Sequence, residues 1–272
     1  MKKSVTLYIL LLALSIGVLF LLNLFLGSVD IPFRSIWNIL WGMDEGESVI
    51  WQNIIWKSRV PQALTAMVAG AGLAVSGLQM QTVFRNPLAG PSVLGISSGA
   101  SLGVAFVVLL SGSIGGIALS RLGFMGEIAL TMAAIIGALS IMALIVYVSQ
   151  KVHGNVTLLI IGVMIGYVAN AVIGVLKFFS VEEDIRAYVI WGLGSFARVS
   201  GNQMMVFVCI MSVLLPLSFL LIKTLNLLLL GDAYARNLGL NIKRARLQVI
   251  ACSGVLVAIV TAYCCPITFL GL

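Results

Sequence analysis

Seven long apolar segments dominate this sequence, each close to the roughly 20 residues that a helix needs to cross a bilayer. Soluble domains carry about 25% charged residues, whereas only 9% of these 272 residues are charged and 61% are hydrophobic. Because the connections are short, the sequence predicts a single all-α domain over residues 1–272, a polytopic membrane helical bundle of about seven transmembrane helices. The segments are Val5–Leu26, Pro61–Gln79, Ser92–Leu110, Ile128–Val148, Thr157–Phe178, Met204–Ile222 and Leu247–Tyr263.

The first segment follows two lysines, Lys2 and Lys3, as the apolar region of a secretory signal would. A signal's apolar region is usually about 7–15 residues long, and this segment is longer. Small residues at Gly27 and Ser28 leave cleavage open. We expect the segment to remain as an uncleaved first helix.

The placement of lysine and arginine predicts a cytoplasmic N-terminus. With that orientation the inner side carries nine basic residues and one acidic residue, Asp232, and the outer side carries seven basic and eight acidic residues. The positive-inside rule counts basic residues, and five of them lie in the last inner loop. The isoelectric point of about 9.5 thus reflects topology, and we expect no nucleic-acid partner.

Sequence patterns for nucleotide or metal chemistry are missing. There is no G-x-x-x-x-G-K-[ST] phosphate loop, and no acid pair lies within a span. Ionisable groups inside a membrane are costly and mark chemistry or ion pathways, and the span interiors hold none. The cysteines (Cys209, Cys252, Cys264 and Cys265) and the single histidine, His153, have no metal-binding spacing. We therefore expect no catalytic residues, no metal and no cofactor.

A polar turn, Arg85-Asn86-Pro87, joins the second and third segments. Pro87 breaks the helix and restricts Asn86 to extended geometry, which suits a gate or an ordinary tight loop. In the third segment Gly95, Gly99 and Gly103 are spaced by four residues, so a helix would place them on one face with Ser98 and Ser101 nearby. Such a face can line a path for a solute or pack against another helix, and both readings stay open.

The pattern F-R-N-P-L-A-x-P-x-x-L-G-x-S-x-G-A, which begins at Phe84, resembles the permease subunits of bacterial importers for iron–siderophore, haem and cobalamin, the FecCD type. The resemblance implies a homodimer in the bacterial inner membrane that receives substrate from an external binding protein and is driven by a cytoplasmic ATPase subunit. It further implies an inner gate at Asn86, Pro87 and Leu88, and a path along the small residues of the third segment.

A second match lies at about residues 225–246, between the sixth and seventh segments. Here Asp232 is expected to cap a short helix, Ala233–Leu238, and Gly239 to end it. The family presents a G-D-x-A-x-x-L-G segment to its ATPase, and Gly231, Asp232, Ala235, Leu238 and Gly239 match it. The resemblance implies a coupling element, and we expect Ala235 and Leu238 to be exposed on it.

On the predicted outer side, Lys57 and Arg59 precede the second segment. Family permeases commonly show R-x-P-R here, with arginines that pair with acidic residues of the binding protein. Arg59 matches the first arginine, but Gln62 replaces the second, and Lys57 is a possible substitute. The alternative is that these are interfacial charges that snorkel to the membrane surface.

The outer segment Gly27–Ser58 carries isoleucines near helical spacing together with several tryptophans. Tryptophan favours the headgroup level, so we expect a surface-lying amphipathic helix, with the acidic turn Asp44–Glu47 exposed to water.

Family permeases usually have ten spans, and a V-P-H-x-x-R sequence follows the segment at which this chain stops. We therefore expect counterparts of about three family helices to be missing, either because the gene is short or because the chain is a fragment. Two alternatives to the importer remain. One is a secondary transporter or channel, and the other is an inactive shortened permease that only docks partners.

Overall fold

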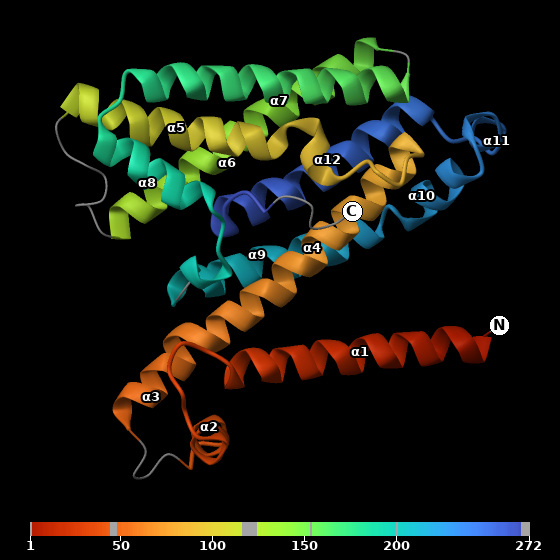
Figure 1. The fold of residues 1–272 in the computed structure, drawn as a ribbon. Coiled ribbons are helices and arrows are strands. Elements are labelled where there is room, and N and C mark those ends of the chain that lie inside the picture. Colours follow the sequence, from red (N-terminus) through yellow and green to blue (C-terminus); the bar gives the residue numbers. More distant parts are fainter. Residues whose placement is uncertain (1, 44–47, 116–123, 153, 200, 268–272) are drawn as a thin grey trace. The chain divides into compact units, whose positions relative to one another are not determined.

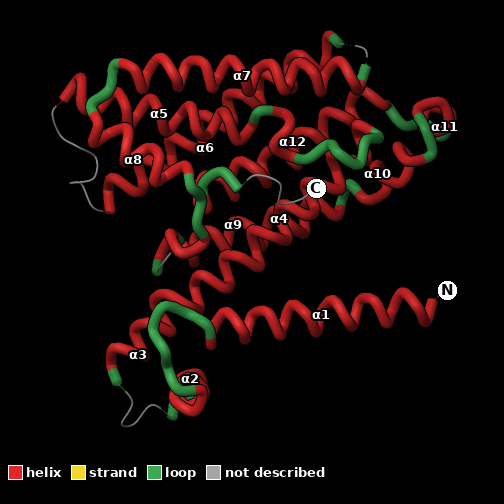
Figure 2. Tube along the Cα trace, in the orientation of Figure 1, coloured by secondary structure: helices red, strands yellow, loops and turns green. Residues whose placement is uncertain are grey.

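The fold of this protein is built from helices (Figure 1). The computed structural model describes residues 2–43, 48–115, 124–152, 154–199 and 201–267, and no strand occurs among them (Figure 2). In chain order the α-helices are α1 (Lys2–Phe25), α2 (Phe33–Leu40), α3 (Val49–Ile54), α4 (Val60–Phe84), α5 (Ile96–Gly115), α6 (Phe124–Lys151), α7 (Asn155–Phe178), α8 (Glu182–Gly192), α9 (Asn202–Phe219), α10 (Ile222–Leu229), α11 (Asp232–Asn237) and α12 (Ile242–Cys264).

Each apolar segment predicted from the sequence coincides with a helix, namely α1, α4, α5, α6, α7, α9 or α12. Among the described residues, six helical stretches are long and apolar enough to cross a membrane, and α5 adds a shorter apolar stretch, Ile96–Leu110. The prediction of an all-α polytopic membrane bundle is therefore confirmed. The six stretches are Val5–Phe25, Val49–Phe84, Met125–Lys151, Val156–Phe178, Asn202–Phe219 and Ile242–Cys264.

The chain divides into two compact units, the first formed by Met1–Met67 with Phe196–Met205 and the second by Val68–Ser195 with Val206–Leu272. The first unit has its own small core, made of Ile31, Ile36, Ile39 and Ile55. Helix α2 buries its isoleucines in that core and exposes Trp37 on another face. This is the amphipathic helix predicted from the sequence, whereas the acidic turn Asp44–Glu47 lies outside the described residues.

The second unit is held together by close contacts between α5 and its neighbours α6, α7 and α12 (Figure 1). A hydroxyl pair also joins α4 to α12, with the Oγ atoms of Ser76 and Ser253 2.5 Å apart. Both serines are almost fully buried. Because a buried hydroxyl needs a partner, this pair fixes which faces of the two helices meet.

One predicted helix start is wrong. The third span was expected to begin at Ser92, but Pro91–Leu94 form a 3₁₀ turn and α5 begins at Ile96. Between them Gly95 has a φ of +74°, which is left-handed geometry that glycine adopts without strain. Gly95 thus lies at the hinge before α5 rather than on the helix face that carries Gly99 and Gly103.

Candidate functional site

The turn after α4 is closed by a residue in an unusual conformation. The backbone N–H of Asn86 donates to the carbonyl oxygen of Gln81 at 3.2 Å, the pattern of a helix cap in which the preceding residue is left-handed. That residue is Arg85, with a φ of +49°. Glycine is the usual residue there, and left-handed geometry costs any other residue about 1–2 kcal/mol. The turn then continues with the side chain of Asn86, whose Oδ1 accepts from the N–H of Leu88 at 2.9 Å.

The predicted coupling element is a pair of short helices with glycine at both junctions. Gly231, with a φ of +106°, separates α10 from α11, and Gly239, with a φ of +85°, ends α11. The N–H of Leu240 donates to the carbonyl oxygen of Ala235 at 2.9 Å, which completes the left-handed cap. Asn241 then caps α12 by accepting a hydrogen bond from the N–H of Arg244 at 3.1 Å. The predicted short helix and its stop at Gly239 are confirmed.

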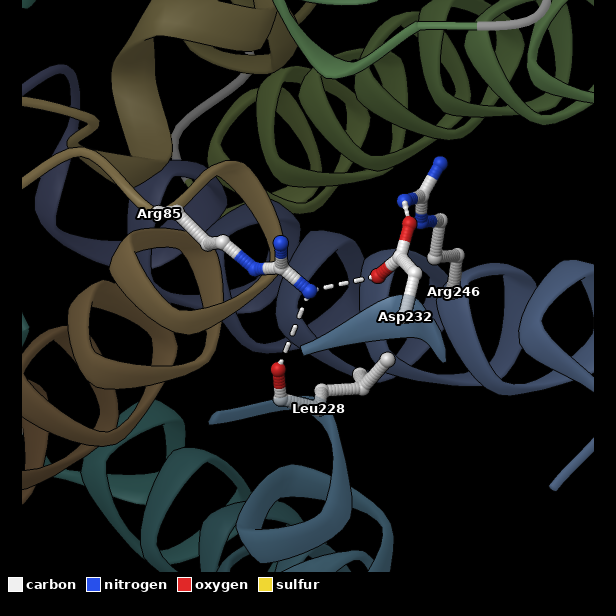
Figure 3. Close-up of polar contacts among 4 residues, drawn as sticks. All are labelled: Arg85, Leu228, Asp232 and Arg246. Atoms are coloured by element: carbon white, nitrogen blue, oxygen red, sulfur yellow. Dashed lines mark hydrogen bonds and ion pairs between the residues drawn. The ribbon is translucent and has the colours of Figure 1, made fainter. Parts of the chain in front are cut away.

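Asp232 joins the coupling element to two other parts of the second unit (Figure 3). Its Oδ1 accepts a charge-assisted hydrogen bond from Arg85 at 2.5 Å, and its Oδ2 accepts one from Arg246 of α12 at 2.5 Å. The Arg85 guanidinium also donates to the carbonyl oxygen of Leu228, near the end of α10, at 3.3 Å. We call Arg85, Asp232 and Arg246 the ion-pair cluster.

The ion-pair cluster contributes little to the stability of the fold. Its side chains are 43%, 37% and 24% exposed for Arg85, Asp232 and Arg246, respectively. Exposed ion pairs contribute about 0–1 kcal/mol each, which roughly offsets the cost of the left-handed Arg85. A glycine at residue 85 would therefore give a chain of similar stability, so stability alone does not explain the arginine.

Two details predicted for the coupling element are wrong. Asp232 does not cap α11, because Gly231 holds the N-cap position and the Asp232 carboxylate is taken up by the two arginines. Ala235 is fully buried rather than exposed. Leu238, in contrast, is 62% exposed, and Tyr234 on the same helix is exposed too. An apolar surface of α11 therefore remains uncovered in the described part of the chain.

A cavity of about 480 Å³ lies beside the ion-pair cluster. Its wall includes Asp232 and Arg236 of α11, Lys243 and Arg246 of α12, and Val83 of α4. Cationic side chains outnumber the single carboxylate in this wall. The ends of several helices therefore border open space and not a packed core.

The small residues of α5 separate into two groups. A Cβ atom added to Gly99 would lie 2.7 Å from the carbonyl oxygen of Gly137 in α6, and one added to Gly103 would overlap the carbonyl oxygen of Ala133. These two glycines thus form a packing seam that lets α5 and α6 approach closely. Gly95 instead lies against α7, where an added Cβ would be 3.0 Å from the carbonyl oxygen of Gly162.

The serines of α5 have different surroundings. Ser98 lines a cavity of about 220 Å³ together with Ser92, Gly95, Tyr167 and Asn170. Hydroxyl, amide and phenol groups therefore gather on this cavity, which lies between the start of α5 and α7. Ser101 does not line it.

The Ser101 hydroxyl is instead engaged within the unit. It donates to the carbonyl oxygen of Ser97 at 3.1 Å and forms a hydrogen bond with Tyr188 of α8. Burial raises the pKa of the Tyr188 phenol, and the hydrogen bond to Ser101 opposes that shift in part. The phenol is therefore neutral at physiological pH. Ser101 serves the α5–α8 contact in this conformation.

Arg59 and Lys57 differ sharply in exposure within the first unit. The Arg59 side chain is buried, and its guanidinium donates to the carbonyl oxygens of Leu24 at 2.6 Å, Phe25 at 3.2 Å and Val29. It thereby satisfies carbonyl groups at the C-terminal end of α1, where a cation also complements the helix dipole. Lys57 is exposed. Of the two candidates for contact with a binding protein, only Lys57 presents its charge at the surface of this unit.

Sequence reasoning missed Arg85 and Arg246 as site residues. Arg85 stands inside the F-R-N-P-L-A pattern, and its signal was a cation at the end of a helix where glycine is usual. Arg246 was counted only as a basic residue of the inner loop. No sequence pattern relates these arginines to Asp232. Arg85 is 147 positions from Asp232 and Arg246 is 14 positions from it, and only the fold shows that both contact its carboxylate.

In the described ranges, no group of three or more histidine, cysteine, aspartate or glutamate side chains is arranged to hold a metal ion. The geometry offers helix ends, small-residue contacts and an exposed apolar helix surface. These features define an α-helical integral membrane protein.

Comparison with known proteins narrows this class to one family. The model of the FecCD transport family matches residues 12–272, and the chain belongs to that family. It is similar to the hemin transport system permease protein HmuU of Yersinia pestis, at 36% identity over 251 residues, covering 91% of this chain and 70% of that protein. It is also similar to the vitamin B12 import system permease protein BtuC of Serratia proteamaculans (strain 568), at 35% identity over 266 residues, covering 97% of this chain and 73% of that protein.

Among solved structures, a metal-chelate type ABC transporter in an inward-facing conformation matches with a TM-score of 0.76 and 29% identity. The match covers 96% of this chain and 76% of that one. The chain is therefore a permease subunit of the ABC-importer type. Permeases of this family are not themselves enzymes.

Proposed function

We propose that this chain moves an iron chelate, haem or a cobalamin-type compound across the bacterial inner membrane, from an external binding protein to the cytoplasm. The observation that carries the proposal is the family match over residues 12–272, since the two named relatives transport hemin and vitamin B12. Residues 1–272 act as one permease domain that pairs with a second copy of itself. ATP is hydrolysed by a separate subunit, and the N-terminus is cytoplasmic.

The residues that contact the ATPase are those of the coupling element. Gly231 and Gly239 define the ends of α11, and the exposed Leu238 with Tyr234 gives this helix an apolar surface. An exposed apolar patch marks an interaction site when no other part of the chain covers it. The buried Ala235 supports this site indirectly, because it packs α11 against the rest of the second unit.

The substrate path is proposed to pass the inner turn at Asn86, Pro87 and Leu88. The Leu88 side chain is 76% exposed, so it is available to a substrate or to a second protomer. Of the small residues, Gly95 and Ser98 border a largely apolar cavity whose wall also carries Tyr167 and Asn170, and these polar groups support a place on the path. Gly99, Gly103 and Ser101 support the path indirectly, because their contacts hold α5 against α6 and α8.

Lys57 is proposed as the cation that meets the binding protein. Arg59 keeps α1 in place, since its three carbonyl partners would have to be released before it could reach an acidic partner. Salt-bridge contacts of this kind act mainly on the association rate and weaken as salt is raised.

Co-purification tests the proposal against a secondary transporter or channel. The full chain is solubilised from its own bacterium in mild detergent and captured by a C-terminal tag, and the bound proteins are assayed for ATP hydrolysis. We expect a nucleotide-hydrolysing subunit to be retained by the wild-type chain and released by Leu238→Asp, which places a charge in the apolar contact. A chain that purifies without any ATPase and drives uptake from an ion gradient would contradict the importer.

A further inference from the structure

We propose that the ion-pair cluster is the mechanical link between the coupling element and the inner turn, with Arg85 and Arg246 as positioning residues for transport. This inference rests on the proposed function, because it supposes that an ATPase moves α11. It goes further by naming the side chains through which that movement reaches Asn86, Pro87 and Leu88. Neither arginine was assigned a role by the sequence patterns.

Arg85 has an unusual backbone conformation. Its φ of +49° is one that glycine adopts freely and other residues avoid. Backbone outliers of this kind persist where the side chain or the geometry serves a function. The Arg85 side chain donates to Asp232 and to the Leu228 carbonyl oxygen, and both residues belong to the coupling element. The contacts of Arg85 with the coupling element therefore explain why an arginine, and not a glycine, occupies this position.

Asp232 binds a different arginine with each of its two carboxylate oxygens. Oδ1 binds Arg85 and Oδ2 binds Arg246, so one carboxylate joins the end of α4, the start of α11 and the first turns of α12 (Figure 3). Asp232 is the first residue of α11, whose other surface carries the exposed Leu238. A force applied at Leu238 thus reaches the carboxylate through only about two turns of helix.

Arg85 is adjacent in the chain to the inner turn. Arg85 immediately precedes Asn86, whose side chain accepts the hydrogen bond that shapes the inner turn. A displacement of the Arg85 guanidinium therefore acts on the backbone next to Pro87 without any intervening flexible segment. The cavity of about 480 Å³ leaves open space beside Asp232 and Arg246.

The ion pairs of the cluster are partly exposed to solvent and therefore weak. Partly exposed ion pairs form and break at little cost, whereas buried ones do so only at large cost. A link that breaks and re-forms its contacts in each transport cycle needs partly exposed ion pairs. The exposed fractions of 43% for Arg85 and 37% for Asp232 place the pair in that class.

The experiment uses the full chain with its co-purified ATPase in proteoliposomes, with the binding protein outside and with hemin, cyanocobalamin and a ferric siderophore as probes. The measured quantity is the number of probe molecules taken up per ATP hydrolysed. The variants are Arg85→Gly, which removes the side chain and suits the left-handed backbone, and Asp232→Asn, which keeps the shape and removes the charge. Arg85→Lys is the conservative variant, and Lys151→Gln removes an exposed cation at the end of α6, outside the coupling element, and serves as the control.

We expect Arg85→Gly and Asp232→Asn to keep their membrane abundance, their bound ATPase and their ATP hydrolysis. Their uptake per ATP should fall by about tenfold, within the usual range of coupling between sites. Arg85→Lys should restore part of the loss, and Lys151→Gln should match the wild type. A purely structural role would instead lower abundance and leave the ratio of the surviving molecules unchanged.

Wild-type uptake per ATP in Arg85→Gly overturns the link while leaving the importer intact. If Arg85→Gly does not reach the membrane, Asp232→Asn decides by the same ratio. A wild-type chain that takes up none of the three probes with ATP contradicts the proposed function, and the link falls with it.

Discussion

The seam between α5 and α6 gives the sharpest test of the packing, through the substitution Gly103→Ala. The added Cβ would overlap the carbonyl oxygen of Ala133 and lie 3.1 Å from the Cα of Gly137. Both are backbone atoms, so the overlap is relieved only if α5 and α6 move apart. Overpacking of this kind costs about 1–3 kcal/mol.

A matched control isolates that cost. Gly174 of α7 has no neighbouring atom within 4 Å of an added Cβ, so Gly174→Ala changes the helix propensity without a clash. Alanine is favoured over glycine in a helix by about 1 kcal/mol, and this gain is common to both variants. The difference in the free energy of unfolding between the two variants is therefore the clash alone, about 1–3 kcal/mol.

Thermal unfolding in detergent measures this difference. A thiol-reactive dye reports unfolding, because Cys264 and Cys265 are buried in the folded chain. With about 2–4 °C per kcal/mol for a domain of similar size, Gly103→Ala should melt about 2–12 °C below Gly174→Ala. Equal melting temperatures for the two variants would refute the claim that α5 and α6 meet at this seam.

Three further outcomes are expected. Arg59→Met should lower the free energy of unfolding by about 2–4 kcal/mol, because it strands buried carbonyl groups at the end of α1, whereas Lys57→Met should leave stability unchanged and weaken binding-protein docking at low salt. Single cysteines in a cysteine-free chain should be labelled by a water-soluble thiol reagent at Ser98 but not at the fully buried Ala100, and protection at both positions would remove Ser98 from the path. Gly239→Val should keep the chain in the membrane but uncouple ATP hydrolysis from uptake, because a left-handed valine costs about 1 kcal/mol or more, and unimpaired coupling would count against α11 as the lever.

The sequence predicted the helices well because a span is a local property. About 20 consecutive apolar residues identify a membrane helix whatever surrounds it, and each predicted segment overlaps a long helix. Gly239 was also predictable, since a glycine after a short helix is the usual C-terminal cap. The start of α5 was misplaced because Pro91–Leu94 are as apolar as a helix, and only their 3₁₀ geometry distinguishes them.

The contacts between distant residues could not be predicted. Asp232 in the sequence looks like a helix cap, and only the fold shows that Arg85 and Arg246 take its carboxylate. Arg59 looks like an exposed family arginine, and only the packing of the first unit shows that α1 ends against its guanidinium. In both cases a local pattern singled out the residue but could not show which groups it contacts in the fold.

ATP-driven uptake into sealed vesicles tests the central claim most directly. The full chain and its co-purified ATPase are placed in proteoliposomes with the binding protein outside, ATP is sealed within, and ionophores collapse all ion gradients. We predict that the accumulation of hemin or cyanocobalamin persists with ionophores and stops when ATP is replaced by a non-hydrolysable analogue. Uptake that the ionophores abolish while ATP is present would contradict the account.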